Sequence, residues 1–120
     1  MISLLVALAG GLGAVARFEV DTLVARHNRW TVPAGTLVIN VTSCVLLGMV
    51  VGWVAGHPAA GDLKDVLGVG FLGGYSTFST ASVEGARLLR AGRTRAAVVH
   101  AGGMLVASLA AAWLGLAITS

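Results

Sequence analysis

Residues 70–84 read Gly-Phe-Leu-Gly-Gly-Tyr-Ser-Thr-Phe-Ser-Thr-Ala-Ser-Val-Glu and lie within the third of four apolar stretches of the chain. The adjacent Gly73 and Gly74 each weaken a helix by about 1 kcal/mol. Hydroxyl side chains follow at Ser76, Thr77, Ser79, Thr80 and Ser82. In hydrocarbon, the backbone groups that a broken helix frees are tolerated only where protein or a water-filled cavity meets them. The stretch therefore predicts a broken third helix that lines a path for an ion or a solute.

The composition of the chain indicates a single membrane domain over residues 1–120. Hydrophobic residues make up 57% of the sequence and charged residues 11%, whereas soluble proteins are typically about 45–50% apolar. The formal net charge is +3, but the arginines flank apolar stretches and form no patch with aromatic residues, so we expect no nucleic-acid partner. The single cysteine, Cys44, excludes an internal disulfide and leaves no zinc-binding spacing.

Four apolar stretches predict an all-α fold of four membrane-spanning helices, at about residues 2–23, 33–55, 66–86 and 96–118. The first stretch lacks a basic start, so we interpret it as a retained span and not as a signal peptide. Pro33 suits the first turn of the second helix, and Trp30 suits the membrane interface. An even number of spans places both termini on the same side of the membrane.

Arg17 lies near the end of the first span, about one helical turn before Asp21. Its side chain can reach the headgroup region, pair with Asp21, or supply positive charge to a vestibule for an anion. Asn40 lies inside the second span and shares a helix face with Thr36 and Ser43. Because its amide offers two donors and an acceptor, Asn40 either joins helices or contacts a solute.

Two titratable residues, Glu84 and His100, lie near span ends. We interpret both as interfacial residues and not as members of a proton relay. The sequence contains no phosphate-binding loop, no metal-ligand spacing and no nucleophile with a base, so we expect no enzyme. A proton-coupled exporter would need a carboxylate deep within a span. The remaining classes are a channel, or a structural subunit that only binds partners.

Three motifs now match one family in order and spacing. They are Gly-Gly-Leu-Gly-Ala-Val-Ala-Arg at 10–17, Pro-Ala-Gly-Thr-Leu-Val-Ile-Asn at 33–40, and the stretch at 70–84. The chain closely resembles the Fluc/CrcB family of fluoride channels over essentially its whole length. The resemblance implies four-helix subunits that assemble as an antiparallel dimer, with two fluoride pores and a structural sodium ion at the dimer interface.

The resemblance also implies roles for individual residues. The fluoride pathway would comprise Asn40, Phe78, Thr80, Ser82, Glu84, Ser108 and Thr36. Arg17 resembles the vestibule arginine of the family, and the backbone carbonyls of Gly73 and Ser76 would bind sodium. The edge of a phenyl ring is positive, so Phe78 is suited to replace part of the hydration shell of a small anion.

The sequence departs from the family pattern at Ala81, where relatives carry a second pore phenylalanine. We interpret the protein as a fluoride-selective channel subunit that lowers cytoplasmic fluoride by passive export of the anion. The alternative is a non-conducting structural subunit that completes the pore of an oppositely oriented paralogue.

The basic residues predict a fixed orientation in the cell membrane. Of the eight lysines and arginines, all except Lys64 fall on or toward the side opposite the termini. Under the positive-inside rule this bias places both termini outside, whereas a subunit with dual topology would show almost no bias. We therefore expect an antiparallel heterodimer with a paralogue in membrane lipid, with an antiparallel homodimer as the alternative.

Overall fold

A computed structural model describes residues 1–29 and 34–120, which are almost entirely helical and contain no strand. The elements are α1 (Ile2–His27), α2 (Ala34–Ala55), the 3₁₀ turn η1 (Pro58–Ala60), α3 (Gly61–Lys64), the π-helical η2 (Asp65–Leu72), α4 (Gly73–Tyr75), α5 (Ser79–Arg90) and α6 (Thr94–Thr119). The prediction of an all-α chain is confirmed. The expectations for Trp30 and Pro33 lie outside the described residues.

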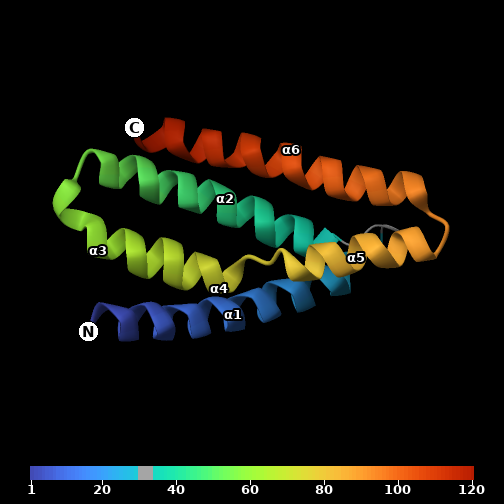
Figure 1. The fold of residues 1–120 in the computed structure, drawn as a ribbon, viewed down its shortest axis with the longest axis horizontal. Helices are drawn as coiled ribbons and strands as arrows, with labels where there is room; N and C mark the ends of the chain where they lie inside the picture. The colour runs from blue at the N-terminus through green and yellow to red at the C-terminus, as the bar shows by residue number, and fades with distance from the viewer. Residues whose placement is uncertain (30–33) are drawn as a thin grey trace.

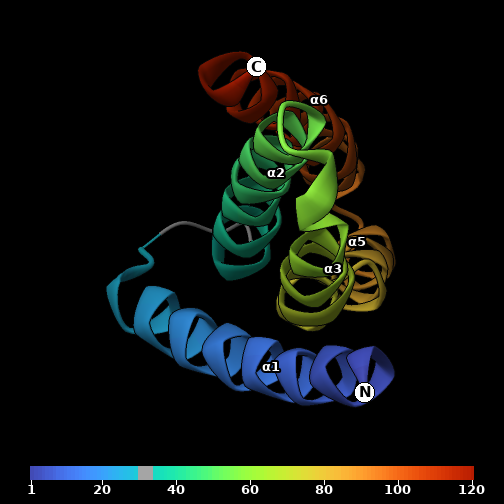
Figure 2. The same cartoon turned by 90° about the vertical axis from the view of Figure 1, so that its left-hand side faces the viewer.

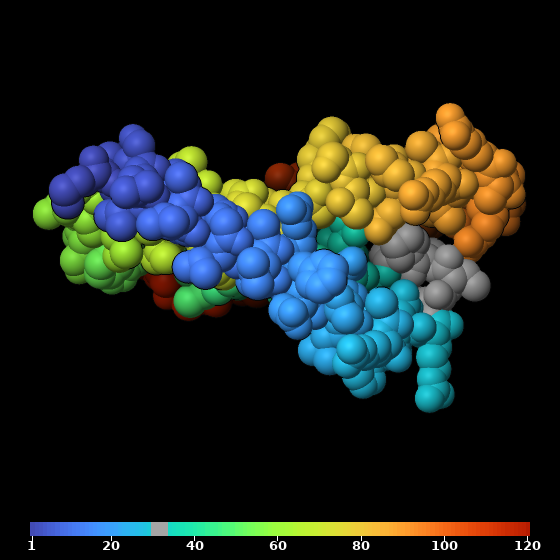
Figure 3. Space-filling model, turned by 90° about the horizontal axis from the view of Figure 1, so that it is seen from below, coloured from blue at the N-terminus to red at the C-terminus, as the bar shows by residue number. Residues whose placement is uncertain are grey.

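The helices run nearly along the long axis of a molecule of 51 × 28 × 23 Å. Both termini lie at one end, and the turn between α5 and α6 lies at the other (Figure 1). Helix α2 packs mainly against α6, whereas α1 packs mainly against η2 and α4. Figure 2 shows α1 crossing one side of the bundle, apart from α6. Seen from below, α1 covers the first half of the 61–90 segment and leaves α5 uncovered (Figure 3).

Glycines allow the helices to approach closely. A side chain at Gly48 of α2 would meet the Ala112 backbone of α6, and one at Gly115 would meet the Val45 backbone. On the other side of the bundle, a side chain at Gly13 of α1 would meet the carbonyl of Phe71. Close backbone approach through small residues is the usual packing mode of helices in lipid. The small residues around Gly13 thus form a helix-packing face.

Three described helices, α1, α2 and α6, are long and apolar enough to cross a membrane. Only 6%, 22% and 17% of their most apolar windows are buried within the chain. Residues 61–90 run alongside them as a series of shorter helices, at the place predicted for the third span (Figure 1). The surface left outside the bundle is therefore mostly apolar, as expected for a multi-pass membrane protein.

The helical run of 61–90 is interrupted between Tyr75 and Ser79. Ser76 has extended backbone, with φ −74° and ψ 162°. The glycine pair does not mark the interruption, because Gly73 and Gly74 are both helical. A side chain at Gly74 would instead meet the carbonyl of Gly10 in α1. Gly74 therefore serves helix packing, and the interruption begins two residues later.

Candidate functional site

The interruption is held by the side chain of Asn40 in α2. Asn40 Nδ2 donates to the carbonyl oxygen of Thr77 at 2.8 Å, and the Thr77 N–H donates to Asn40 Oδ1, also at 2.8 Å. One amide side chain thus satisfies both backbone groups of a residue that has left the helix. A buried backbone group without a partner costs about 1–3 kcal/mol, so this pairing stabilises the interrupted conformation.

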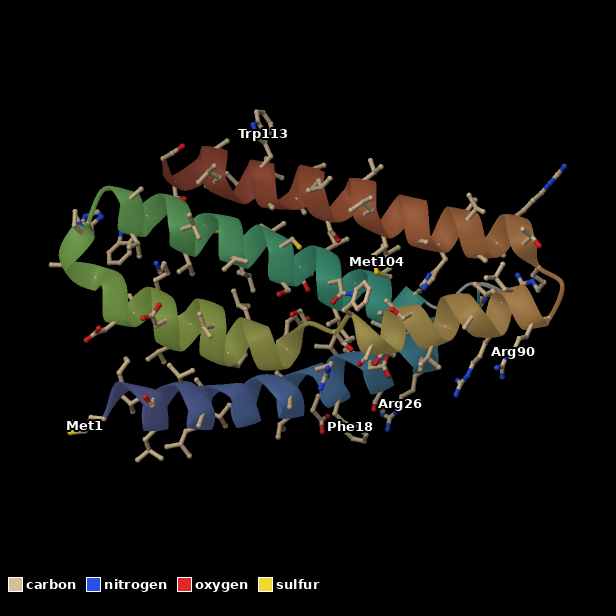
Figure 4. All side chains as sticks on the ribbon, viewed as in Figure 1. Met1, Phe18, Arg26, Arg90, Met104 and Trp113 are labelled. Atoms are coloured by element: carbon tan, nitrogen blue, oxygen red, sulfur yellow. The ribbon has the colours of Figure 1, made fainter. Side chains whose placement is uncertain are left out.

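The second proton of the Asn40 amide faces α6. Nδ2 also donates to Met104 Sδ at 3.3 Å, and Met104 is a buried residue whose side chain points from α6 into the bundle (Figure 4). A thioether sulfur is a weak acceptor. One Asn40 donor is therefore bound to a strong backbone acceptor, and the other is held only weakly.

Hydroxyl side chains form hydrogen bonds at the start of α5, the helix that follows the interruption. Thr77 Oγ1 accepts the Thr80 N–H at 3.2 Å and donates to Thr80 Oγ1 at 3.0 Å. It also lies 3.3 Å from Ser79 Oγ. Thr77 is buried, whereas Thr80 is exposed. The first free amide of α5 is thus satisfied locally, and Thr80 lies at the surface of this cluster.

The side chain of Arg17 in α1 also contacts the interruption between Tyr75 and Ser79. Its guanidinium Nη1 donates to the carbonyl oxygen of Ser76 at 3.2 Å. The described residues contain no ion pair between Arg17 and Asp21, so this alternative for Arg17 is not observed. Asp21 instead packs against Gly35 at the start of α2. Arg17 therefore helps to satisfy the backbone of the interruption, and its role is not only that of a residue at the membrane interface.

A groove of about 550 Å³ runs beside the interruption between α2, α5 and α6. Four of the residues predicted for the fluoride pathway line it, and they are Asn40, Phe78, Ser82 and Ser108. Ser76, Ala81, Met104 and His100 also line it. The ring of Phe78 is 87% exposed in the single chain. The groove thus combines hydroxyl and amide groups with one exposed aromatic ring.

The predicted residues Thr36 and Glu84 do not line this groove but contact each other beside it. Thr36 Oγ1 donates to Glu84 Oε1 at 2.8 Å, and Glu84 Oε2 lies 3.6 Å from His100 Nε2. His100 is only 5% exposed. The interpretation of Glu84 and His100 as interfacial residues is wrong, because burial and mutual contact join them to the core of the bundle.

The sequence contained a signal for the contact between Glu84 and His100. Both residues lie eight positions from Gly92, which has a positive φ of 73° at the turn between α5 and α6. Equal spacing about a tight helix–helix turn places two residues opposite each other. Glycine suits such a turn because it adopts positive φ without steric cost.

Gly73 and Ser76 present backbone oxygens near the interruption. The Thr77 N–H, the usual helical partner of the Gly73 carbonyl, is bound to Asn40 instead. Gly73 is exposed, and its nearest neighbour is the Gly68 carbonyl, 3.9 Å from the place of a side chain. No cluster of three His, Cys, Asp or Glu residues suited to a metal occurs in the described chain.

Comparison with known proteins identifies related sequences. Residues 4–116 match the family described as CrcB-like protein, Camphor Resistance (CrcB). "Fluoride-specific ion channel FluC 2" of Cutibacterium acnes is 48% identical over 121 residues, covering 100% of this chain and 98% of the relative. "Fluoride-specific ion channel FluC 1" of Leifsonia xyli subsp. xyli is 45% identical over 116 residues, covering 97% and 85%. "Fluoride-specific ion channel FluC 2" of Rhodococcus jostii is 39% identical over 120 residues, covering 100% of both chains.

The pairing between Asn40 and Thr77 can be tested by amide hydrogen exchange. Asn40→Ala should accelerate exchange at Thr77 by about tenfold or more, because a hydrogen bond worth about 1–1.5 kcal/mol is lost. Thr42→Val serves as the control, since it removes a different contact of α2, the 3.0 Å contact between Thr42 Oγ1 and Tyr75 Oη. Unchanged Thr77 exchange in Asn40→Ala would show that the amide does not hold the interruption.

Proposed function

Because this chain belongs to the CrcB-like family, we propose that it is a subunit of a fluoride-specific channel that exports the anion passively. The full-length relatives named as fluoride-specific channels support this function. It is not an enzyme. The alternative of a non-conducting structural subunit is not favoured, since the relatives are named as channels and match almost the whole of this chain.

The observation that carries the proposal is the groove beside the interrupted helix. A small anion that leaves water needs N–H and O–H donors in place of its hydration shell. Asn40 offers an N–H whose present acceptor is only the Met104 sulfur, so an anion can replace that acceptor at low cost. Ser108 supplies a hydroxyl along the same groove, and the edge of the Phe78 ring supplies a positive electrostatic surface. Ser82 also lines the groove, and its hydroxyl, which donates to the Phe78 carbonyl oxygen at 2.9 Å, would have to turn to meet an anion.

Residues at the edge of the groove complete the proposed pathway. Thr80 presents its hydroxyl at the surface of the cluster around Thr77. Thr36 and Glu84 extend the polar track toward the other end of α5. Arg17 supplies a positive charge near the entrance, where its guanidinium is bound to the Ser76 carbonyl. In this proposal the anion passes from a vestibule at Arg17, past the Phe78 ring and the Asn40 amide, to the polar side chains of Thr36 and Glu84.

The membrane potential drives export in this proposal. A negative interior favours exit of a monovalent anion by about 2.3 kcal/mol per 100 mV. Fluoride enters cells as neutral hydrogen fluoride and ionises in a less acidic cytoplasm, so a passive path is sufficient to lower its concentration. No transported co-substrate is required.

A second subunit would complete the pore. The Phe78 ring is 87% exposed in the single chain, and the groove beside it is open to its surroundings. An exposed ring next to polar groups is poorly placed against lipid, so we infer that a second, antiparallel subunit covers it. Ala81 lines the groove at the position where the family pattern implies a second ring, which favours a partner with its own phenylalanine.

A paralogue is our preferred partner, with a homodimer as the alternative. The names FluC 1 and FluC 2 among the relatives support paralogous pairs. The arginine bias agrees with a fixed orientation, since Arg26 and Arg90 lie toward the same end of the molecule (Figure 4). Both termini would then face the outside of the cell membrane, and the paralogue would insert the other way.

We place the structural sodium ion of the proposal at the carbonyls of Gly73 and Ser76. The Gly73 carbonyl has lost its usual helical donor, and Gly73 is exposed in the single chain. A carbonyl oxygen has two lone pairs, so the Ser76 oxygen can bind a cation beside the Arg17 donor. When bound, the ion would stabilise the facing carbonyls of the two subunits and take no part in conduction.

Fluoride efflux from vesicles tests the proposed function. The reconstituted assembly, formed by this chain alone or with a paralogue, should pass fluoride and exclude chloride. Phe78→Ile should slow fluoride efflux by about two- to tenfold, because an aromatic contact is worth about 0.5–1.5 kcal/mol. Phe18→Ile is the matched control, since Phe18 points away from the bundle (Figure 4). Comparable chloride flux in the unmodified assembly would rule out the assignment.

Accessibility of introduced cysteines tests the orientation. In a Cys44→Ser background, Arg26→Cys and Arg93→Cys should react only from the cytoplasmic side, because the arginine-rich end stays inside. Ala59→Cys, at the opposite end of the bundle, should react only from outside. Labelling of every site from both sides, together with fluoride efflux from this chain alone, would support the homodimer and exclude a fixed orientation.

A further inference from the structure

His100 and Glu84 form a buried contact beside the groove. The side chain of His100 is 3% exposed and that of Glu84 is 17% exposed. Glu84 Oε2 and His100 Nε2 lie 3.6 Å apart, and neither atom has a hydrogen-bond partner. The other carboxylate oxygen, Oε1, accepts the Thr36 hydroxyl at 2.8 Å. The two atoms without hydrogen bonds therefore face each other.

The position of His100 connects this contact to the groove. His100 lines the groove together with Asn40 and Ser108, whereas Glu84 does not. An anion in the groove thus meets the imidazole before the carboxylate. A carboxylate without a counter-charge would oppose an anion nearby, because charges act over longer distances in the low dielectric of a bundle interior.

We propose that His100 compensates the charge of Glu84 and so keeps the groove passable to an anion. The inference rests on the proposed function. A histidine and a carboxylate that hold one proton between them have no net charge, whether the proton is on the imidazole or on the carboxyl group. His100 acts through Glu84 and need not bind fluoride, so it is a positioning residue for the pathway.

The pair also has a structural consequence. Glu84 belongs to α5, Thr36 to α2 and His100 to α6, so one carboxylate joins three helices. Removal of one member of a buried charge pair usually costs more than removal of both, because a single charge is left without compensation. This asymmetry separates charge compensation from simple packing, since packing predicts greater damage from the double change.

The experiment compares His100→Gln, Glu84→Gln and the double variant in the same reconstituted assembly. Efflux is measured at a pH of about 6, which lies above the ordinary pKa of a carboxyl group and below that of an imidazole. His100→Gln should slow fluoride efflux by about tenfold, because a unit charge about 10 Å from an anion at an effective dielectric constant of about 20 changes its occupancy by roughly that factor. The double variant should recover to within about twofold of the unmodified rate.

His57→Gln is the matched control. His57 is exposed at the opposite end of the bundle, where it stacks on Trp53 at 4.5 Å, and its replacement should leave efflux unchanged. An unmodified assembly without fluoride efflux would refute the proposed function instead. The recovery of assembled protein would still test the pairing, because the double variant should then assemble better than His100→Gln.

Two results would overturn the inference. One is normal efflux in a folded His100→Gln assembly. The other is a double variant as slow as His100→Gln, which would mean that the imidazole itself is required. If His100→Gln does not assemble, the yields of assembled protein from His100→Gln and from the double variant are compared instead. Recovery of yield in the double variant supports charge compensation, and equal loss contradicts it.

Discussion

The bidentate pairing between the Asn40 amide and the backbone of Thr77 is the interaction on which the rest of the structure depends. It allows the polar segment at residues 76–78 to leave the helix in a membrane protein without leaving the Thr77 backbone unpaired. Because the Thr77 N–H turns toward α2, the Gly73 carbonyl loses its usual helical donor. The Thr80 N–H, the usual donor to the Ser76 carbonyl, is bound to Thr77 Oγ1 instead. Arg17 takes one of these carbonyls. The polar groups of the proposed pathway and the polar groups that stabilise the interruption therefore lie next to each other.

This arrangement would allow a chain of 120 residues to hold the proposed anion pathway. Regular helices can offer a groove only side-chain donors, because their backbone donors are used internally. The interruption places Ser76 and Phe78 beside side chains of α2 and α6. Close packing through glycines such as Gly48 and Gly13 keeps the remaining helices near enough to form its walls. The exposed aromatic ring then makes a second subunit part of the proposed site.

The sequence predicted the helices better than it predicted the contacts between them. Apolar length is a property of each segment, so the all-helical fold and the polar third segment could be inferred directly. The exact interruption could not, because it depends on Asn40, which lies 37 positions before Thr77. The glycine pair misled for the same reason, since Gly74 is required by the approach of Gly10 in α1. His100 was misinterpreted because its burial depends on how α5 and α6 meet, although its spacing from Gly92 carried that information.

The most direct test of the central claim, that fluoride passes through the groove beside the interruption, uses the only cysteine of the chain. Cys44 lines the groove and is partly accessible. Reaction of Cys44 with a bulky thiol reagent should stop fluoride efflux from the reconstituted assembly, whereas the Cys44→Ser variant should remain active in the presence of the reagent. Stoichiometric labelling of Cys44 with unchanged efflux would show that the anion takes a different path.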